Sequence, residues 1–414
     1  MKLLNNNKRF LITGGNFTNK GAQSMLFVAV DEIKKRFVDA EIIVLPLDDY
    51  RIYKENLQFR AIRNHPDVFK LDGKKSTLIK LLCKNILRFF LFRKNWIFSE
   101  LFNYPQIMRS LDLIVDISGF CLSSQFVNSY NMSLVRTINE AKKYNVPIVL
   151  MPQSFGPFDY KNEKDEMLKA IRSVIDYPYA IFAREQDGFD QLIKTFGVQN
   201  VRQSVDLVLQ NKGVDLKNIY KSIPDIRYVK AMPNSVALIP NSMNVEQSNH
   251  SKTVLYYKTI IEFLRLQGKH VYIASHSGMD MQLCKEIYES LEETSSIELI
   301  KEELMSYEFD VFVKQMDFVV ASRYHSIVHA YKNFIPCVIL GWSVKYVYLS
   351  KVVGQDNMSF DIRNSSIDSI CSAIKRMCSD FNKESELIKN HVINLQDANC
   401  FDVLNEIIGD SFKE

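Results

Sequence analysis

The segment VVASRYHSIVHA, residues 319–330, brings an arginine and a histidine to the expected start of a helix. The apolar residues 318–321 predict a buried strand, and residues 327–331 begin a helical pattern. A strand-to-helix turn favours an anion, because its backbone N–H groups are unpaired and the helix dipole is positive there. Arg323 could grip a phosphate or carboxylate, and His325 could donate a proton near neutral pH. Alternatively, both side chains cap the helix and pair with carboxylates elsewhere.

His325 and His329 stand four residues apart, a spacing that could hold a metal ion on one helix face. The segment lacks the glutamate of an HExxH motif and has no third ligand nearby in sequence. We therefore expect no metal, and we expect His329 to be a packed helix residue.

The loop after the first apolar run, Thr13 to Leu26, contains three glycines and two asparagines. Ligands of open α/β sheets bind beyond the carboxyl ends of strands, so polar residues there are candidates for a site. Gly15 permits close approach of a ligand to the backbone, and Asn16 or Asn19 could bond sugar hydroxyls or a phosphate. The loop is neither GxGxxG nor a Walker loop, so a tight turn that needs glycine is an equal interpretation.

Two later runs also end in polar residues. Asp116 follows residues 113–115 and could act as a base toward a hydroxyl group or cap the following turn. Ser118 comes just after it, and Gln153 belongs to the rigid polar turn MPQSFGP. Both are candidates for hydrogen bonds to a substrate.

Arg184 repeats, in the first half of the chain, the arrangement of an arginine before a helix. Two such arginines facing one cleft would suit a small, multiply charged anion. Alternatively, Arg184 pairs at the surface with Glu185 or Asp187, a contact of little energetic value. The remaining candidates for substrate binding are Asn241, His276 and Lys345.

Short apolar runs alternate with helical patterns along the chain, which predicts parallel sheets covered by helices. The first series comprises residues 10–13, 22–36, 42–45, 113–116, 133–144, 147–151, 164–175, 180–183 and 187–195. The second comprises residues 236–240, 253–267, 270–274, 281–293, 297–300, 307–314, 318–321 and 336–340. We predict two Rossmann-like, doubly wound α/β domains, residues 1–220 and 221–414, with a cleft between them. The tail, residues 366–412, has a helical pattern and could pack across both domains.

The bulk composition excludes several classes of protein. A net charge of +4 over 414 residues gives no general case for nucleic-acid binding. The 7 cysteines are scattered, odd in number and without CxxC spacing, as in a reducing compartment. The first residues fit a strand better than a signal peptide, and no run reaches the length of a membrane span. We therefore expect a cytoplasmic protein.

Residues 74–99 contain no acidic residue and combine a basic stripe with aromatic side chains. Lys80, Lys84 and Arg88 recur every four residues. Such a helix could lie on an anionic membrane surface, which would make the protein peripheral at the inner membrane face. It could equally cover the sheet of the first domain with its basic stripe in water.

The motifs, taken in order, resemble those of the polysaccharide pyruvyltransferase family between Thr13 and Tyr346: GGNFTNKGAQSML, DISGF, MPQSFGPF, ARE, SVDLVL, ASRYHSIVHA and GWSVKY. The resemblance implies a GT-B-like architecture and transfer of the enolpyruvyl unit of phosphoenolpyruvate onto a sugar diol as a cyclic ketal. The acceptor would be a surface-polysaccharide or lipid-linked oligosaccharide precursor. No cofactor is implied beyond the donor substrate.

The resemblance places the family's arginine-x-histidine motif on Arg323 and His325, its first-domain arginine on Arg184 and its strand-end aspartate on Asp116. His325 would be the general acid and Asp116 a possible base, with the arginines holding phosphoenolpyruvate. The chain departs from many relatives in having NKGAQS without an acid in the first loop, Ser-Gly-Phe in place of a glycine run, and Tyr324 in place of leucine. These departures concern the identity of the acceptor.

Two other functions fit the same pattern. A nucleotide-sugar glycosyltransferase of GT-B architecture would use the same glycine-bearing loop and cleft. A noncatalytic member of the family would bind glycans or act as a scaffold for a surface-polysaccharide assembly, although the arginine, histidine and aspartate at three strand ends argue against it.

Overall fold

The computed structural model describes residues 7–46, 54–62, 80, 83, 98–247 and 249–410. The first domain is built on a parallel sheet with the strand order β3-β2-β1-β4-β5-β6-β7. The strands are β1 (Arg9–Thr13), β2 (Glu41–Leu45), β3 (Arg60–Ala61), β4 (Leu113–Asp116), β5 (Ile148–Gln153), β6 (Ala180–Ala183) and β7 (Val201–Gln203). Its helices are α1 (Lys20–Arg36), α3 (Phe98–Arg109), α4 (Asn128–Tyr144), α5 (Lys164–Arg172) and α6 (Gln186–Phe196).

The second domain repeats this architecture with the strand order β10-β9-β8-β11-β12-β13, again parallel. The strands are β8 (Ser235–Ile239), β9 (His270–Ile273), β10 (Ile297–Leu299), β11 (Phe318–Ala321), β12 (Cys337–Gly341) and β13 (Ser359–Asp361). The helices are α7 (Met243–Gln247), α8 (His250–Leu266), α9 (Met281–Glu289), α10 (Ser306–Val313), α11 (Tyr324–Lys332) and α12 (Val344–Val352). The central strands are buried on both faces, as expected of a sheet covered by helices.

Helix α1 joins the two domains. Its residues 25–33 are buried all round the helix, because one side packs on the first sheet and the N-terminal end packs against α10 and α11. The ring of Phe27 lies 6.4 Å from that of Tyr307 in the second domain. One apolar cluster therefore runs without interruption from one domain into the other.

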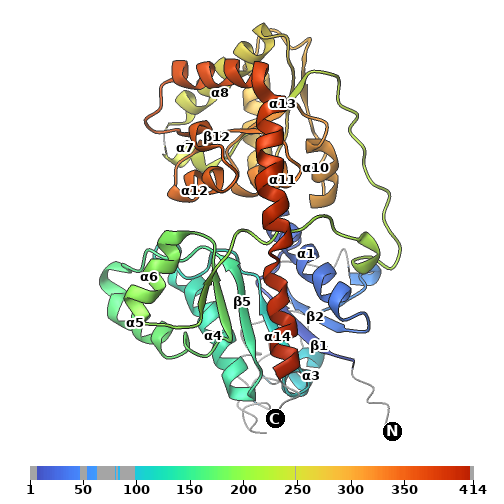
Figure 1. Cartoon of the computed structure of the whole chain (residues 1–414), viewed down its shortest axis with the longest axis vertical. Helices are drawn as coiled ribbons and strands as arrows, with labels where there is room; N and C mark the ends of the chain where they lie inside the picture. Colours follow the sequence, from blue (N-terminus) through green and yellow to red (C-terminus); the bar gives the residue numbers. More distant parts are fainter. Residues whose placement is uncertain are drawn as a thin grey trace.

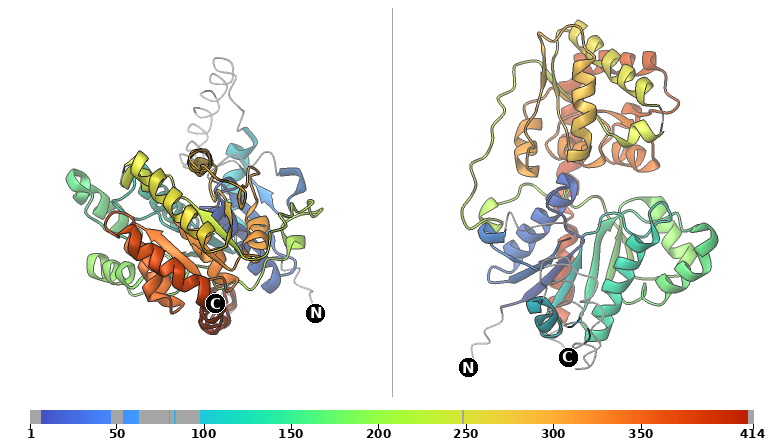
Figure 2. Two further views of the ribbon diagram at one scale, coloured as in Figure 1. Left: turned by 90° about the horizontal axis from the view of Figure 1, so that it is seen from above. Right: turned by 180° about the vertical axis from the view of Figure 1, so that it is seen from behind.

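The chain returns to the first domain at its end. Helix α13 (Ile367–Asp397) starts on the second domain and runs down the molecule past the junction, and α14 (Val403–Asp410) lies beside the first sheet (Figure 1). The two further views in Figure 2 show the same course. Cys400 N donates to Gln210 Oε1 at 2.9 Å, and Arg202 Nη2 donates to Glu406 Oε2 at 2.9 Å. The tail thus packs across both domains, a placement that its helical pattern left open, and the boundary at residue 220 stays a prediction.

The predicted fold class, two doubly wound α/β domains with a helical tail, is confirmed. The strands β3, β7 and β13 were not predicted, because each has at most three residues and no apolar run. The predicted basic aromatic helix 74–99 falls almost entirely outside the described residues, so its membrane-surface role stays a prediction. Among the described residues, no helix combines the length and apolar character needed to cross a bilayer.

Candidate active site

The strand-to-helix turn predicted around Arg323 is present. Strand β11 ends at Ala321, Arg323 is the N-terminal cap of α11, and the helix begins at Tyr324. The guanidinium of Arg323 donates to both carboxylate oxygens of Asp280, at 2.7 and 2.5 Å. Asp280 is fully buried. The fork of Arg323 is therefore held by a carboxylate just before α9, which fixes the position of the guanidinium.

Arg184 lies in a buried cluster rather than at the surface. Its Nη1 donates to Asp206 Oδ2 at 2.6 Å, and its Nη2 donates to the carbonyl of Gly119 at 2.7 Å and to Ser154 Oγ at 2.8 Å. Arg184 is 4% exposed. The alternative of a surface pair with Asp187 or Glu185 therefore does not describe this side chain, although Glu185 lies 3.9 Å away inside the same cluster.

His325 approaches the same aspartate from the second domain. Its Nε2 lies 3.5 Å from Asp206 Oδ2, longer than a normal hydrogen bond, and has no other partner among the described residues. Burial lowers the pKa of His325, and Asp206 offsets part of this effect. Burial also disfavours ionisation of Asp206, but His325 and Arg184 outweigh it and hold the pKa of the carboxyl below its ordinary value. Asp206 is thus the anion that links Arg184 to His325.

Tyr324 lies between the cations of the two domains. The guanidinium carbon of Arg184 is 4.8 Å from the centre of its ring, and Lys345 Nζ is 5.6 Å from that centre. Lys345 also lies within 6 Å of the rings of Phe120, Trp342 and Tyr346. Burial, followed by the charge of Arg184, lowers the pKa of Lys345 to about 8. Within the described part of the chain, no carboxylate forms an ion pair with Lys345.

The first turn of α1 covers His325. A Cβ atom on Gly21 would lie 2.3 Å from His325 Nδ1, so only glycine allows this close approach. Nearby, Lys20 Nζ donates to Glu303 at 3.1 Å, and Gln23 Oε1 accepts from Ser306 N at 2.8 Å. The contact between the domains thus passes directly over the imidazole.

Gly21→Ala tests the predicted role of His325 as a general acid and is expected to lower kcat by about a hundredfold, since a displacement of about 1 Å at a reacting group has effects of that size. The new methyl group must push α1 and His325 apart. Steady-state kinetics on the purified variant measures the effect. Ala22→Ser, on the same turn, serves as the control, and a Gly21→Ala enzyme with wild-type kcat would show that the contact does not matter.

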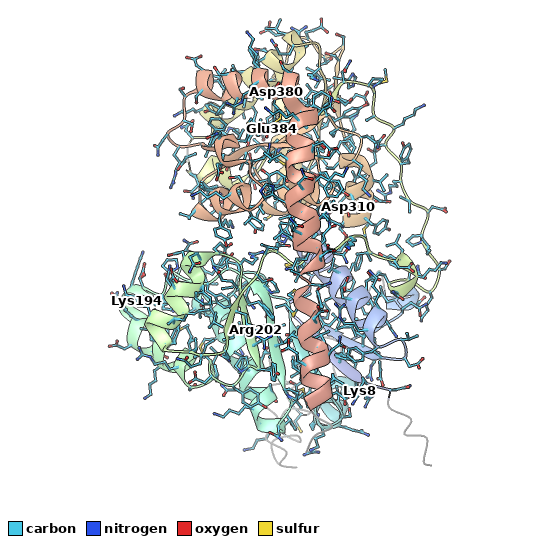
Figure 3. The ribbon with its side chains drawn as sticks, in the orientation of Figure 1. Lys8, Lys194, Arg202, Asp310, Asp380 and Glu384 are labelled. Carbon is cyan, nitrogen blue, oxygen red and sulfur yellow. The ribbon has the colours of Figure 1, made fainter. Side chains whose placement is uncertain are left out.

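His329 and His276 form a second cluster behind His325. His329 bonds Asp310 through Nδ1 and Ser24 through Nε2, both at 2.7 Å, so it is a buried, fully bonded helix residue. Asp310 lies on α10 of the second domain (Figure 3). The ring of His276 stacks edge-on against that of Phe309, with centres 4.8 Å apart. The described residues contain no group of three or more ligands arranged for a metal ion.

Acid is expected to destabilise the protein through His276. Burial and then the neighbouring His329 hold its pKa well below the ordinary value. Below about pH 6.5 the unfolded chain therefore binds a proton that the native protein does not bind. This lowers the free energy of unfolding by about 1.4 kcal/mol for each pH unit. Urea unfolding at several pH values between 5 and 7 should show a shallower pH dependence for His276→Gln. An unchanged slope would rule out this source of acid sensitivity.

Asp116 does not join the cluster around His325. It is 1% exposed and accepts hydrogen bonds from Thr13 Oγ1, Ser118 N and Oγ, and Gln153 Nε2. Burial raises its pKa, and these hydrogen bonds offset part of the rise. Ser118 and Gln153 thus hold Asp116 at the end of β4, beside a pocket of the first domain. Its role as a base stays a prediction.

The other predicted binding residues shape loops. Asn19 caps α1 by accepting from Gly21 N and Ala22 N, and Asn16 accepts from Thr18 N and Asn19 N. Gly15 lies against Leu26, where a Cβ would sit 3.2 Å from a side-chain carbon. Asn241 Nδ2 donates to the carbonyl of Ser322 at 3.0 Å, which ties the end of β8 to the turn before α11. Their contact with a substrate stays a prediction.

Sequence reasoning gave no role to Asp206 or Asp280, the two buried partners of the arginines. Asp206 follows β7, whose residues VRQ are too short and too polar to predict a strand, so it was not recognised as a strand-end residue. Asp280 precedes α9 directly. An acid just before an apolar helical pattern is a signal that could have drawn attention to it.

Solved structures share this fold at low sequence identity. The glycotransferase of kitacinnamycin is 9% identical, with a TM-score of 0.56 over 97% of this chain and 100% of that one. Anabaena HepE in complex with UDP and glucose is 11% identical, with a TM-score of 0.54 over 98% and 99%. A putative UDP-N-acetylglucosamine 2-epimerase from Listeria monocytogenes is 8% identical, with a TM-score of 0.56 over 93% and 91%. The chain is therefore a two-domain protein of the GT-B fold.

The family follows from the sequence itself. The model of the polysaccharide pyruvyl transferase family matches residues 19–344, which include Arg184, Asp206, Arg323 and His325. The chain belongs to this family. A comparison with curated proteins finds no match.

Proposed function

We propose that the protein transfers the enolpyruvyl unit of phosphoenolpyruvate onto two hydroxyl groups of a sugar, forming a cyclic ketal on a polysaccharide or lipid-linked oligosaccharide precursor. The observation that carries this proposal is the convergence of Arg184, His325 and Lys345 around Tyr324, from both domains. Cations and a potential proton donor at one place match a small substrate with a phosphate and a carboxylate. Family membership supports the same chemistry.

Lys345 is the cation best placed to receive the donor's negative charge. The fork of Arg323 is engaged by Asp280, and Arg184 is engaged by Asp206. Four aromatic rings lie within 6 Å of the Lys345 ammonium group, no carboxylate of the described residues forms an ion pair with it, and a pKa of about 8 keeps it charged at pH 7. The donor would then replace the missing counter-ion, while the two arginines supply a fixed positive field.

The proposed reaction starts with proton transfer from His325 to the methylene carbon of phosphoenolpyruvate. The neighbouring carbon becomes electrophilic, and one sugar hydroxyl adds to it and loses its proton. Phosphate then leaves with the carbon–oxygen bonding pair, and the second hydroxyl closes the ketal as its proton is lost. No electrons are exchanged with a further reactant, so the chemistry needs no redox cofactor. The charge of Asp206, 3.5 Å from His325 Nε2, favours the protonated form of the imidazole.

The decisive experiment incubates the protein with phosphoenolpyruvate and a panel of oligosaccharides, followed by mass spectrometry. A gain of about 70 Da with release of phosphate, the stoichiometry of ketal formation, is the expected result. Parallel samples with UDP-sugars test the glycosyltransferase alternative, for which HepE was solved with UDP and glucose. Sugar transfer with release of UDP, and no use of phosphoenolpyruvate, would overturn the proposal.

Arg323→Lys is expected to raise the KM for phosphoenolpyruvate about tenfold. Lysine cannot donate to both oxygens of Asp280 in the planar geometry of the fork, so the positive charge shifts within the site. Initial rates at varied donor concentration measure the change, with Arg363→Lys as the exposed control on the same domain. An unaltered donor KM would count against a role of Arg323 in donor binding.

A further inference from the structure

The pocket beside Asp116 lies in the first domain, apart from the cluster around His325. It is a pocket of about 270 Å³ between the carboxyl ends of β1 and β4 and one face of α4. The sheet order reverses between β1 and β4, and such a reversal is the usual ligand site of doubly wound sheets. The volume is close to the lower end of small-molecule pockets, about 300 Å³. The pocket is thus placed and sized for one small ring.

One wall of the pocket is a polar stripe on α4. Ser129, Ser133, Arg136 and Thr137 line it, and their spacing puts them on one helix face. Arg136 is exposed, and neither it nor the hydroxyl of Ser129 or Ser133 has a hydrogen-bond partner among the described residues. The facing wall holds Asp116 with its hydroxyl donors. The lining therefore offers unengaged hydroxyl and guanidinium groups on α4, opposite a carboxylate that is already held by its hydroxyl donors.

Exposed aromatic rings lead from the pocket toward the candidate active site. Tyr130 lines the pocket and is 51% exposed, and Phe126 beside it is 39% exposed. The ring centres are 6.1 Å apart between Tyr130 and Phe126, and 4.7 Å apart between Phe126 and Phe120. Phe120 in turn lies 5.4 Å from Lys345 Nζ. A row of three rings thus connects the pocket with the cation of the second domain.

The loop after β4 contributes to both the pocket and the candidate active site. Between Asp116 and Phe120, Ser118 faces the pocket, whereas the carbonyl of Gly119 accepts from Arg184. One short segment of backbone therefore borders both the pocket and the candidate active site.

We propose that this pocket binds one pyranose ring of the acceptor glycan, adjacent to the ring that receives the pyruvyl unit. A pyranose has hydroxyl groups at its edge, which suit the serine, threonine and arginine donors, and apolar C–H faces, which pack on aromatic rings. The aromatic row then supports the glycan on its way to the reacting sugar. That the bound glycan is the acceptor of the reaction rests on the proposed function. That the pocket binds a glycan does not depend on it.

The test is binding of pyranose mono-, di- and tetrasaccharides to the full chain without phosphoenolpyruvate, by saturation-transfer NMR and titration. Ser133→Trp fills the pocket, and Asn139→Trp adds the same ring to an exposed position of α4 that does not line it. We expect at least one oligosaccharide to bind wild type and Asn139→Trp equally and Ser133→Trp about tenfold more weakly or worse. Equal binding to all three proteins, or no glycan bound by wild type, would overturn the proposal.

A second variant covers the case in which Ser133→Trp does not fold, as judged by circular dichroism. Tyr130→Ala removes only an exposed ring and should weaken the same glycan about fivefold to tenfold. Turnover is measured in parallel. Glycan binding without pyruvyl transfer would reject the proposed function and support the glycan-binding pocket. Pyruvyl transfer with an unchanged acceptor KM in the pocket variants would support the proposed function and reject the pocket as a glycan site.

Discussion

Replacing His325 by alanine is expected to lower kcat by about a hundredfold to ten-thousandfold, the usual contribution of a general acid. The fold should survive, because His325 Nε2 makes no normal hydrogen bond in the described structure and Asp206 keeps its bonds from Arg184 and Val208 N. Phosphate release from phosphoenolpyruvate measures activity, and thermal unfolding checks the fold. His250→Ala, at an exposed position of α8, is the matched control.

The pH dependence distinguishes an acid from a positioning residue. Burial lowers the pKa of His325 in the free protein, so its protonated form is gained only as the pH falls. In the wild-type protein, kcat/KM for phosphoenolpyruvate should therefore rise toward acid pH. In His325→Ala, the residual kcat/KM should not show this rise. Full activity in the variant, or an unchanged acid limb, would remove His325 from the proposed chemistry.

Replacing Asp206 by asparagine is expected to cost about 3–5 kcal/mol of the free energy of unfolding, because it leaves the buried Arg184 with only the more distant carboxylate of Glu185, 3.9 Å away. Activity should fall as well, since His325 loses the charge that supports its protonated form. Chemical denaturation gives the stability change. Asp397→Asn, which breaks an ion pair exposed on both sides, should cost less than about 1 kcal/mol.

A double variant distinguishes the effect of the charges of Arg184 and Asp206 from the effect of how their side chains pack. Arg184→Met combined with Asp206→Leu removes both ions of the close pair and should destabilise the protein less than Asp206→Asn alone, because the buried guanidinium goes together with its anion, while Glu185 keeps its hydrogen bond from Ser154 Oγ. It should nevertheless be inactive, since the proposed site loses both ions. A double variant as unstable as the single one would indicate that the geometry of the cluster, rather than its charge balance, stabilises the fold.

Much of the site could be predicted because strand ends are marked locally. The apolar run at residues 318–321 and the helical pattern after it placed Arg323 and His325 at a turn, and the structure has both there. Arg184 was found by the same signal after β6. The position of Asp206 after a strand was not predicted, because that strand, β7, is a polar edge strand of three residues in which no hydrophobic period can be recognised.

The amino-acid sequence by itself determined the order and type of the longer elements, the two parallel sheets and most of the residues at the carboxyl ends of their strands, because hydrophobic periodicity is a local property of the chain. Only the tertiary structure decided which of these residues meet. Arg184 and Asp206 are 22 residues apart, and Gly21 reaches His325 from the other domain. Such partners are selected by burial, since a charge taken out of water needs an opposite charge from wherever the packing brings one.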